Sequence, residues 1–258
     1  MKKFLAIMLT LIVGLTACLG LTACGGAETP SAVADGTLTI GYTIYKPMNY
    51  FEDNDFVGFD TELAEKFCEE IGVKPNFVEI EWNNKFIDLQ SKNIDVIWNG
   101  MTITDEVKEK TAVSSPYLTN KQVVVCLKSN AQKYTDIASI KNVVNVAVET
   151  KSAGHNVVSD AGIPDAKIVK VTAQKDTLLE VASGASEIAV IDLLMAQVLV
   201  GEGTDFANLT FVDVGFENED FGVAFRKSDL GLAKAFDLFI KLSKLDGSYN
   251  ALQAKYFG

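Results

Sequence analysis

The stretch IDVIWNGMTITDEVKEK (94–110) contains the unit from which the fold is built. Its first part, IDVIW (94–98), is a short apolar run that predicts a buried strand. Polar residues and a glycine follow, and the charged segment after them predicts a helix beginning near Asp105. Thr102 and Thr104 either cap this helix or contact a ligand at the end of the strand.

The same alternation of strand and helix continues on both sides of this stretch. Before it we expect strands at 38–42 and 77–82 and helices at 59–72, capped by Asp60, and at 84–91. After it we expect strands at 143–149, 167–171 and 187–191, with helices from about 152, at 174–183 and from about 193. Strands at 211–216 and 221–227 and helices at 229–245 and 248–257 complete the chain. This alternation predicts an α/β fold of parallel sheets covered by helices, and two series of similar length predict two lobes.

The first 24 residues indicate export from the cytoplasm. Two lysines precede an apolar run at 4–17, which suits a signal peptide better than a membrane-spanning helix of roughly 20 apolar residues. The tetrapeptide LTAC occurs at 15–18 and 21–24 and is typical of a lipoprotein cleavage site.

Of the two candidate cysteines, Cys24 is favoured for lipidation over Cys18. A small, polar, linker-like segment follows Cys24, whereas cleavage before Cys18 would leave apolar residues at the new terminus. We therefore expect a signal peptide at 1–23 and a lipidated N-terminus and linker at 24–36, which tether the body to the outer side of the cell membrane. A retained anchor helix is the alternative.

Charge and composition narrow the classes of function. The formal net charge is −11, with 34 acidic residues against 23 basic ones, so nucleic acid is not an expected partner. His155 is the single histidine, which leaves little material for a metal site or a histidine-based triad. Cys68 and Cys126 lie in apolar patterns and are expected to be buried free thiols.

Polar residues follow three of the predicted parallel strands, at 99–104, at 149–154 and at Asp192. Ligands of open α/β sheets collect at the carboxyl ends of strands and in clefts between lobes. Taken singly, each of these residues could instead cap the helix that follows its strand. Together, the three strand ends favour a binding site.

Several longer motifs carry a family resemblance: VGFDTELAEKFCEEIGV, IDVIWNGMTITDE, SSPY, FGVAFRKSDL and DGSYNALQAKYFG. The mature chain, from about Leu38 to Gly258, resembles the extracytoplasmic solute-binding proteins of ABC transporters, in the polar amino-acid family (family 3). The resemblance implies a two-lobed, type II periplasmic-binding-protein fold, with strands crossing between lobes near 120–122 and near Glu217. The first lobe would comprise 37–119 and 218–258, and the second 120–217.

The resemblance also implies ligand-binding residues. Asp192 would receive the ammonium group of an amino acid, helped by the Gly100 carbonyl and the Thr102 hydroxyl, and backbone N–H groups of Ser152 and Ala153 would receive the carboxylate. Tyr45 and Trp82 would form flat aromatic walls against the ligand, although Trp82 is equally consistent with core packing. Asn99 and Met101, on either side of Gly100, complete the expected set of ligand-binding residues.

Val107 departs from the family pattern, because relatives usually carry at this position an arginine that binds the ligand carboxylate. Two interpretations remain open. Lys151, where relatives usually have glycine, supplies the missing positive charge, or the ligand is an amine with a weaker or absent carboxylate.

The implied function is that of a monomeric receptor that captures a small polar solute and delivers it to the permease subunits of an ABC importer, with no cofactor and no catalytic residue. The alternative from a different class is an enzyme of the same fold, similar to a dehydratase, in which Glu149 would donate a proton.

Overall fold

The computed structural model describes residues 33–258. The expected signal peptide (1–23) and Cys24 lie outside the described residues.

The first half of the molecule is built on three neighbouring strands. Strand β1 (Thr37–Tyr42) pairs in parallel with both β4 (Lys74–Glu79) and β5 (Val96–Thr102). The helices that follow these strands along the chain are α2 (Phe59–Ile71), α3 (Lys85–Gln90) and α4 (Asp105–Lys110), and a short hairpin consists of β2 (Tyr50–Glu52) and β3 (Asp55–Val57).

The second half repeats this plan. Strand β8 (Val146–Glu149) lies between β9 (Ile168–Val171) and β10 (Ile188–Asp192), and both pairings are parallel. Helices α5 (Ala153–Asp160), α6 (Asp176–Ala182) and α7 (Leu193–Leu199) belong to this half, and β11 (Leu209–Val212) follows them.

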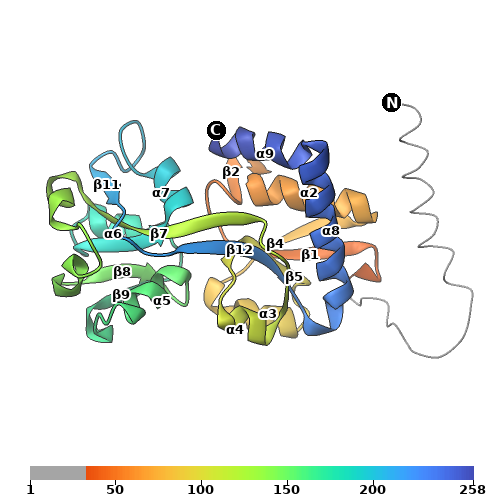
Figure 1. Ribbon diagram of the computed structural model, residues 1–258, viewed down its shortest axis with the longest axis horizontal. Coiled ribbons are helices and arrows are strands. Elements are labelled where there is room, and N and C mark those ends of the chain that lie inside the picture. Colours follow the sequence, from red (N-terminus) through yellow and green to blue (C-terminus); the bar gives the residue numbers. More distant parts are fainter. Residues whose placement is uncertain (1–32) are drawn as a thin grey trace, which may run out of the picture.

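Two long strands connect the halves. Strands β7 (Leu118–Leu127) and β12 (Asn218–Phe225) pair antiparallel, from Asn218 opposite Lys121 to Phe221 opposite Leu118. They run side by side from one half to the other (Figure 1). The two expected sheets are thereby joined, within the described residues, into one path of order β4-β1-β5-β12-β7-β10-β8-β9, with β6 (Ala112–Val113) on β12 and β11 on β7.

The C-terminal helices α8 (Leu230–Asp246) and α9 (Ser248–Phe257) return to the first half and contact α2. Phe236 of α8 lies edge-on to Trp98 at 4.9 Å and to Phe67 at 5.5 Å. Ring centroids of Phe59 and Phe257 are 5.0 Å apart. The core of the first half therefore uses residues from both ends of the described chain.

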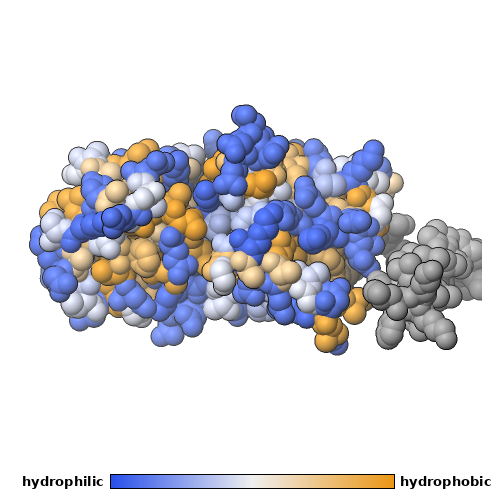
Figure 2. Space-filling model, turned by 90° about the horizontal axis from the view of Figure 1, so that it is seen from above, coloured by the Kyte–Doolittle hydropathy of each residue, from blue (hydrophilic) through white to orange (hydrophobic). Residues whose placement is uncertain are grey.

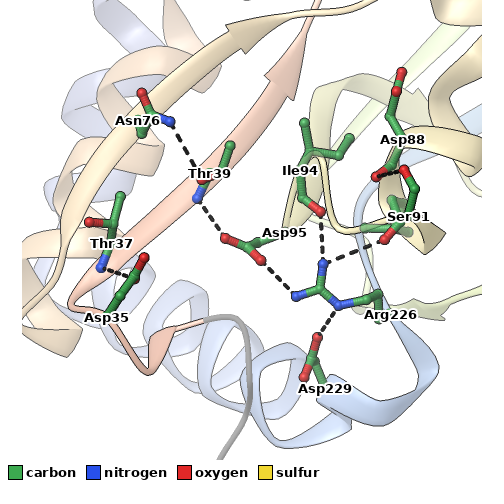
Figure 3. Close-up of polar contacts among 11 residues, drawn as sticks. Asp35, Thr37, Thr39, Asn76, Asp88, Ser91, Ile94, Asp95, Arg226 and Asp229 are labelled. Carbon is green, nitrogen blue, oxygen red and sulfur yellow. Dashed lines mark hydrogen bonds and ion pairs between the residues drawn. The ribbon is translucent and has the colours of Figure 1, made fainter.

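Arg226, directly after β12, fixes three segments of the first half (Figure 3). Its guanidinium donates to the Ile94 carbonyl at 2.7 Å and pairs with Asp95 at 2.6 Å and Asp229 at 2.8 Å. Asp95 also accepts from the Thr39 amide of β1 at 2.9 Å. A planar group with several donors can hold these segments together, so the start of α8 is fastened to β1 and β5.

Several boundaries differ from the sequence prediction. Strand β5 continues to Thr102 instead of ending at Trp98, because Met101 and Thr102 pair with Gly222 and Phe221 of β12. Strand β12 begins at Asn218, earlier than the predicted start at 221.

The prediction that Asp60 caps α2 is wrong. Gly58 occupies the capping position, and the buried Asp60 carboxylate instead accepts from the Gly100 amide at 2.7 Å and from the Tyr117 hydroxyl. Asp60 therefore anchors β5 to α2. Cys68 and Cys126 are buried and free, as expected.

The face shown in Figure 2 is predominantly hydrophilic, with apolar patches scattered over both halves. In the part of the chain from residue 33 onward, no helix is both long and apolar enough to cross a membrane.

Candidate functional site

A cavity lies between the two halves and encloses about 560 Å³ including its open mouth. All ten residues predicted to bind a ligand line it: Tyr45, Trp82, Asn99, Gly100, Met101, Thr102, Lys151, Ser152, Ala153 and Asp192. They come from the ends of β5, β8 and β10 and from the segments after β1 and β4. The structure therefore brings together residues that are up to 147 positions apart in the chain.

Asp192 ends β10 and is 5% exposed. Its carboxylate accepts from three amide side chains, at 2.5 Å from Asn120, 2.7 Å from Gln122 and 2.7 Å from Gln174. Its side chain does not cap α7. Burial raises the pKa of Asp192, while the amide donors favour its charged form.

A second carboxyl group, Glu219 of β12, shares these donors. Asn120 and Gln122 also donate to Glu219 at 2.6 and 2.7 Å. Burial and the charge of Asp192 raise the pKa of Glu219 to about 8. Two amide side chains of β7 thus bridge the carboxyl groups of Asp192 on β10 and Glu219 on β12. The sequence prediction missed Glu219, because no motif within FENEDFG marks it as facing Asp192.

The end of β5 forms one wall of the cavity. Asn99 accepts from the Thr43 hydroxyl at 2.6 Å and donates to the Thr43 carbonyl and to Asn49, so its side chain is used to hold the loop after β1. Gly100 has φ of 54°, and a Cβ there would lie 2.7 Å from the ring of Tyr45. Thr104 caps α4 by accepting from the Val107 amide at 3.2 Å.

The start of α5 forms the opposite wall. Ser152 caps this helix by accepting from the His155 amide at 3.2 Å. The Ser152 amide donates to the Glu149 carbonyl at 3.2 Å. A Cβ on Gly154 would lie 2.6 Å from the Val190 carbonyl, so glycine lets the helix pack closely on β10 beside Asp192.

Val107 is buried, lines the cavity and packs with Trp82 and Met101. It contributes no charge. The buried positive charge of this wall is Lys85 of α3, which the sequence prediction missed. The spacing of Trp82 and Lys85 was the available signal, because residues three apart share one helical face.

Glu149 ends β8, lines the cavity and is 4% exposed. Burial and the nearby charge of Asp192 raise the pKa of Glu149 to about 8, so the group is mostly protonated at neutral pH. The cavity wall therefore includes the Asp192 carboxylate, which amides stabilise, and the protonated carboxyl group of Glu149. Among residues 33–258, no three His, Cys, Asp or Glu side chains are grouped so that they could hold a metal ion.

Comparison with known proteins identifies the family. A model described as bacterial extracellular solute-binding proteins, family 3, matches residues 38–258. The L-arginine-binding protein of Pseudomonas aeruginosa is 26% identical, over 88% of this chain and 90% of its own length. The L-cystine-binding protein TcyJ of Escherichia coli K12 is 29% identical, over 86% of this chain and 83% of its own. The ancestral amino acid-binding protein AncCDT-1, described as a precursor of cyclohexadienyl dehydratase, has a similar crystal structure, with a TM-score of 0.81 and 32% identity over 90% of this chain and 100% of that one. The chain belongs to the bacterial extracellular solute-binding proteins, family 3.

Proposed function

We propose that this receptor captures a free amino acid with a neutral or cationic side chain and delivers it to the permease subunits of an ABC importer. The observation that carries the proposal is the buried Asp192 carboxylate, held by three amide donors on the wall of a cavity between the two halves. Holding a carboxylate charged in a buried place suits a ligand that brings an ammonium group.

The two ends of an α-amino acid fit opposite walls of the cavity. Its ammonium group lies at Asp192, with Gly100 and Thr102 supplying further acceptors. Its carboxylate lies at the start of α5, where the helix dipole favours an anion. The Ser152 amide already donates within its own turn, so Ala153 offers the better amide of the two.

The ligand's side chain is constrained by charge. Asp192 lines the cavity, and an acidic side chain beside its carboxylate would be repelled. Relatives named for L-arginine and L-cystine agree with a ligand of this class. Tyr45 and Trp82 provide aromatic walls for an aliphatic or cationic chain.

A thermal-shift screen followed by calorimetry tests the proposal. The panel contains arginine, ornithine, histidine, cystine and glutamine, with aspartate and glutamate as acidic counterparts. A ligand at 100 times its dissociation constant should stabilise the fold by about 2.7 kcal/mol. Failure of every neutral and cationic amino acid to bind would contradict the proposal.

Asp192→Asn removes the proposed counter-charge with little change of shape, and we expect the affinity for the bound amino acid to fall at least about tenfold. Asp213→Asn is the matched control, because Asp213 pairs with Lys121 at 2.7 Å and does not line this cavity. Equal affinities for wild type and Asp192→Asn would exclude the assigned role of Asp192.

The protonated Glu149 supports a second candidate function, that of an enzyme in which this carboxyl group acts as a general acid. The relation to an ancestral protein described as a dehydratase precursor supports keeping this candidate. Chromatography of each ligand after prolonged incubation separates the two functions. We expect every bound ligand to be recovered unchanged, whereas release of a dehydrated product would favour the enzyme.

We also propose that Cys24 carries a lipid anchor that keeps the receptor at the membrane surface. The support is the small-residue pattern before the cysteine and the polar linker after it. Cys24→Ser should release the protein from the membrane fraction, and Cys18→Ser should leave it attached. The opposite result would assign the anchor to Cys18.

A further inference from the structure

Lys85 is a buried lysine that forms no ion pair within 4 Å in the described part of the chain. It is 4% exposed, and its ammonium group donates to the backbone carbonyls of Trp82 at 3.3 Å and Lys151 at 3.2 Å. It lies 4.5 Å from the centre of the Trp82 ring and 5.1 Å from that of Phe86. Carbonyl oxygens and aromatic faces therefore surround it, without a carboxylate.

A buried charge without a counter-ion is costly and is normally paired or neutralised. Desolvation lowers the pKa of Lys85 to about 8, so most molecules still carry the charge at pH 7. Two carboxyl groups act on Lys85 from a distance, and neither supplies the counter-ion. Glu106 pairs with Lys110 at 2.6 Å, and Glu149, whose pKa is raised to about 8, is mostly protonated at neutral pH. Among residues 33–258, the structure thus holds an ammonium group at the cavity that no carboxylate pairs with directly.

The position of Lys85 suits a ligand held between the halves. The residue belongs to α3 of the first half, and its contact with the Lys151 carbonyl reaches the turn before α5 in the second. Both residues line the cavity together with the start of α5. An anion bound there would contact Lys85 from one side and the Ala153 amide from the other.

We propose that the ammonium group of Lys85 binds the α-carboxylate of the amino acid. This inference rests on the proposed function and names a residue that determines the specificity of the same site. Lys151, the candidate from the sequence, has an exposed side chain and enters the site through its backbone carbonyl. We therefore assign the carboxylate-binding role to Lys85 and not to Lys151.

The test compares an amino acid that wild type binds with its α-carboxamide, which keeps the size of the carboxylate but removes its charge. Lys85→Met should weaken binding of the amino acid tenfold or more, equivalent to about 1.4 kcal/mol. Binding of the carboxamide should change less than about threefold. Calorimetry of both ligands on both proteins gives the coupling between the lysine and the ligand charge.

Two further variants make the result specific. Lys85→Gln can still donate to the two backbone carbonyls without a charge, and it should show the same selective loss even if Lys85→Met fails to fold. Lys151→Met tests the rival candidate at the same cavity, and it should leave the ratio of the two affinities as in wild type.

Three results would overturn the inference while leaving the proposed function intact. Wild type could bind the amino acid and its carboxamide equally well, Lys85→Gln could lose both ligands equally, or Lys151→Met could show the selective loss instead. Absence of any amino-acid binding by wild type would instead overturn the proposed function, so the two failures are distinguishable.

Discussion

At the scale of single residues, Gly100 shows how tightly the cavity wall is constrained. Its φ of 54° is unfavourable for other residues, and a Cβ would lie 2.7 Å from the Tyr45 ring and 3.1 Å from Phe221. We expect Gly100→Ala to lower the free energy of unfolding by roughly 2–4 kcal/mol, because backbone strain and overpacking add.

Gly184→Ala provides the control for Gly100→Ala. Gly184 has φ of 78°, and a Cβ added there would have no other atom within 4 Å, so the substitution costs backbone strain alone. Denaturant titration of both variants should show a clearly larger loss for Gly100→Ala. Equal losses would mean that contact with Tyr45 adds nothing.

The buried carboxyl groups predict a pH dependence of stability. Glu149 and Glu219 both have pKa values raised to about 8, mainly by burial, whereas a glutamate in the unfolded chain has a pKa near 4.3. The folded state therefore binds more protons between these values. The stability that these protonated groups contribute is fully present below about pH 4.3 and is lost as the pH rises toward 8.

Thermal unfolding between pH 5 and pH 8 checks this dependence. The melting temperature should fall by several degrees over this range, and Glu219→Gln should reduce the fall because it removes one of the titrating groups. Glu149 remains, as does Asp60, whose pKa burial raises to about 7. A melting temperature that rises steadily from pH 5 to pH 8 in wild type would contradict the raised pKa values.

At the scale of secondary-structure elements, local sequence patterns were sufficient to predict those strands and helices that depend mainly on neighbouring residues. Strand β1 and helix α2 lie where the apolar spacing predicted them. The type II fold and the solute-binding family expected from the longer motifs are confirmed. Apolar periodicity and sequence motifs are properties of continuous segments of the chain, so they can be recognised in a single sequence.

The family motifs indicated the ten cavity residues, but other features that depend on distant segments were not predicted. The extension of β5 to Thr102 requires β12, more than a hundred residues later. Asp60 appeared to be a helix cap, because its partners Gly100 and Tyr117 lie 40 and 57 positions away. Lys85 and Glu219 were missed for the same reason, since each acquires its role only when the two halves meet.

At the scale of the whole molecule, the connection through β7 and β12 supports a proposal of hinge closure. The proposed lobes are 37–119 with 218–258, and 120–217. The Asp192–Glu219 carboxyl pair lies at the crossing, where Asn120 and Gln122 of β7 contact both groups. A ligand that contacts both halves would stabilise one relative arrangement of them.

Small-angle scattering checks this proposal in solution. A saturating amino acid should either leave the radius of gyration of a closed receptor unchanged or reduce that of an open one, because binding favours the closed arrangement. An increase on binding would contradict closure around the ligand.

The most direct measurement is a crystal structure of the receptor with the amino acid that the screen identifies. We expect the ligand in the cavity between β5 and the start of α5, with its ammonium nitrogen at roughly 3 Å from an Asp192 carboxylate oxygen. A ligand bound elsewhere, or an ammonium group that does not contact Asp192, would refute the assigned role of Asp192.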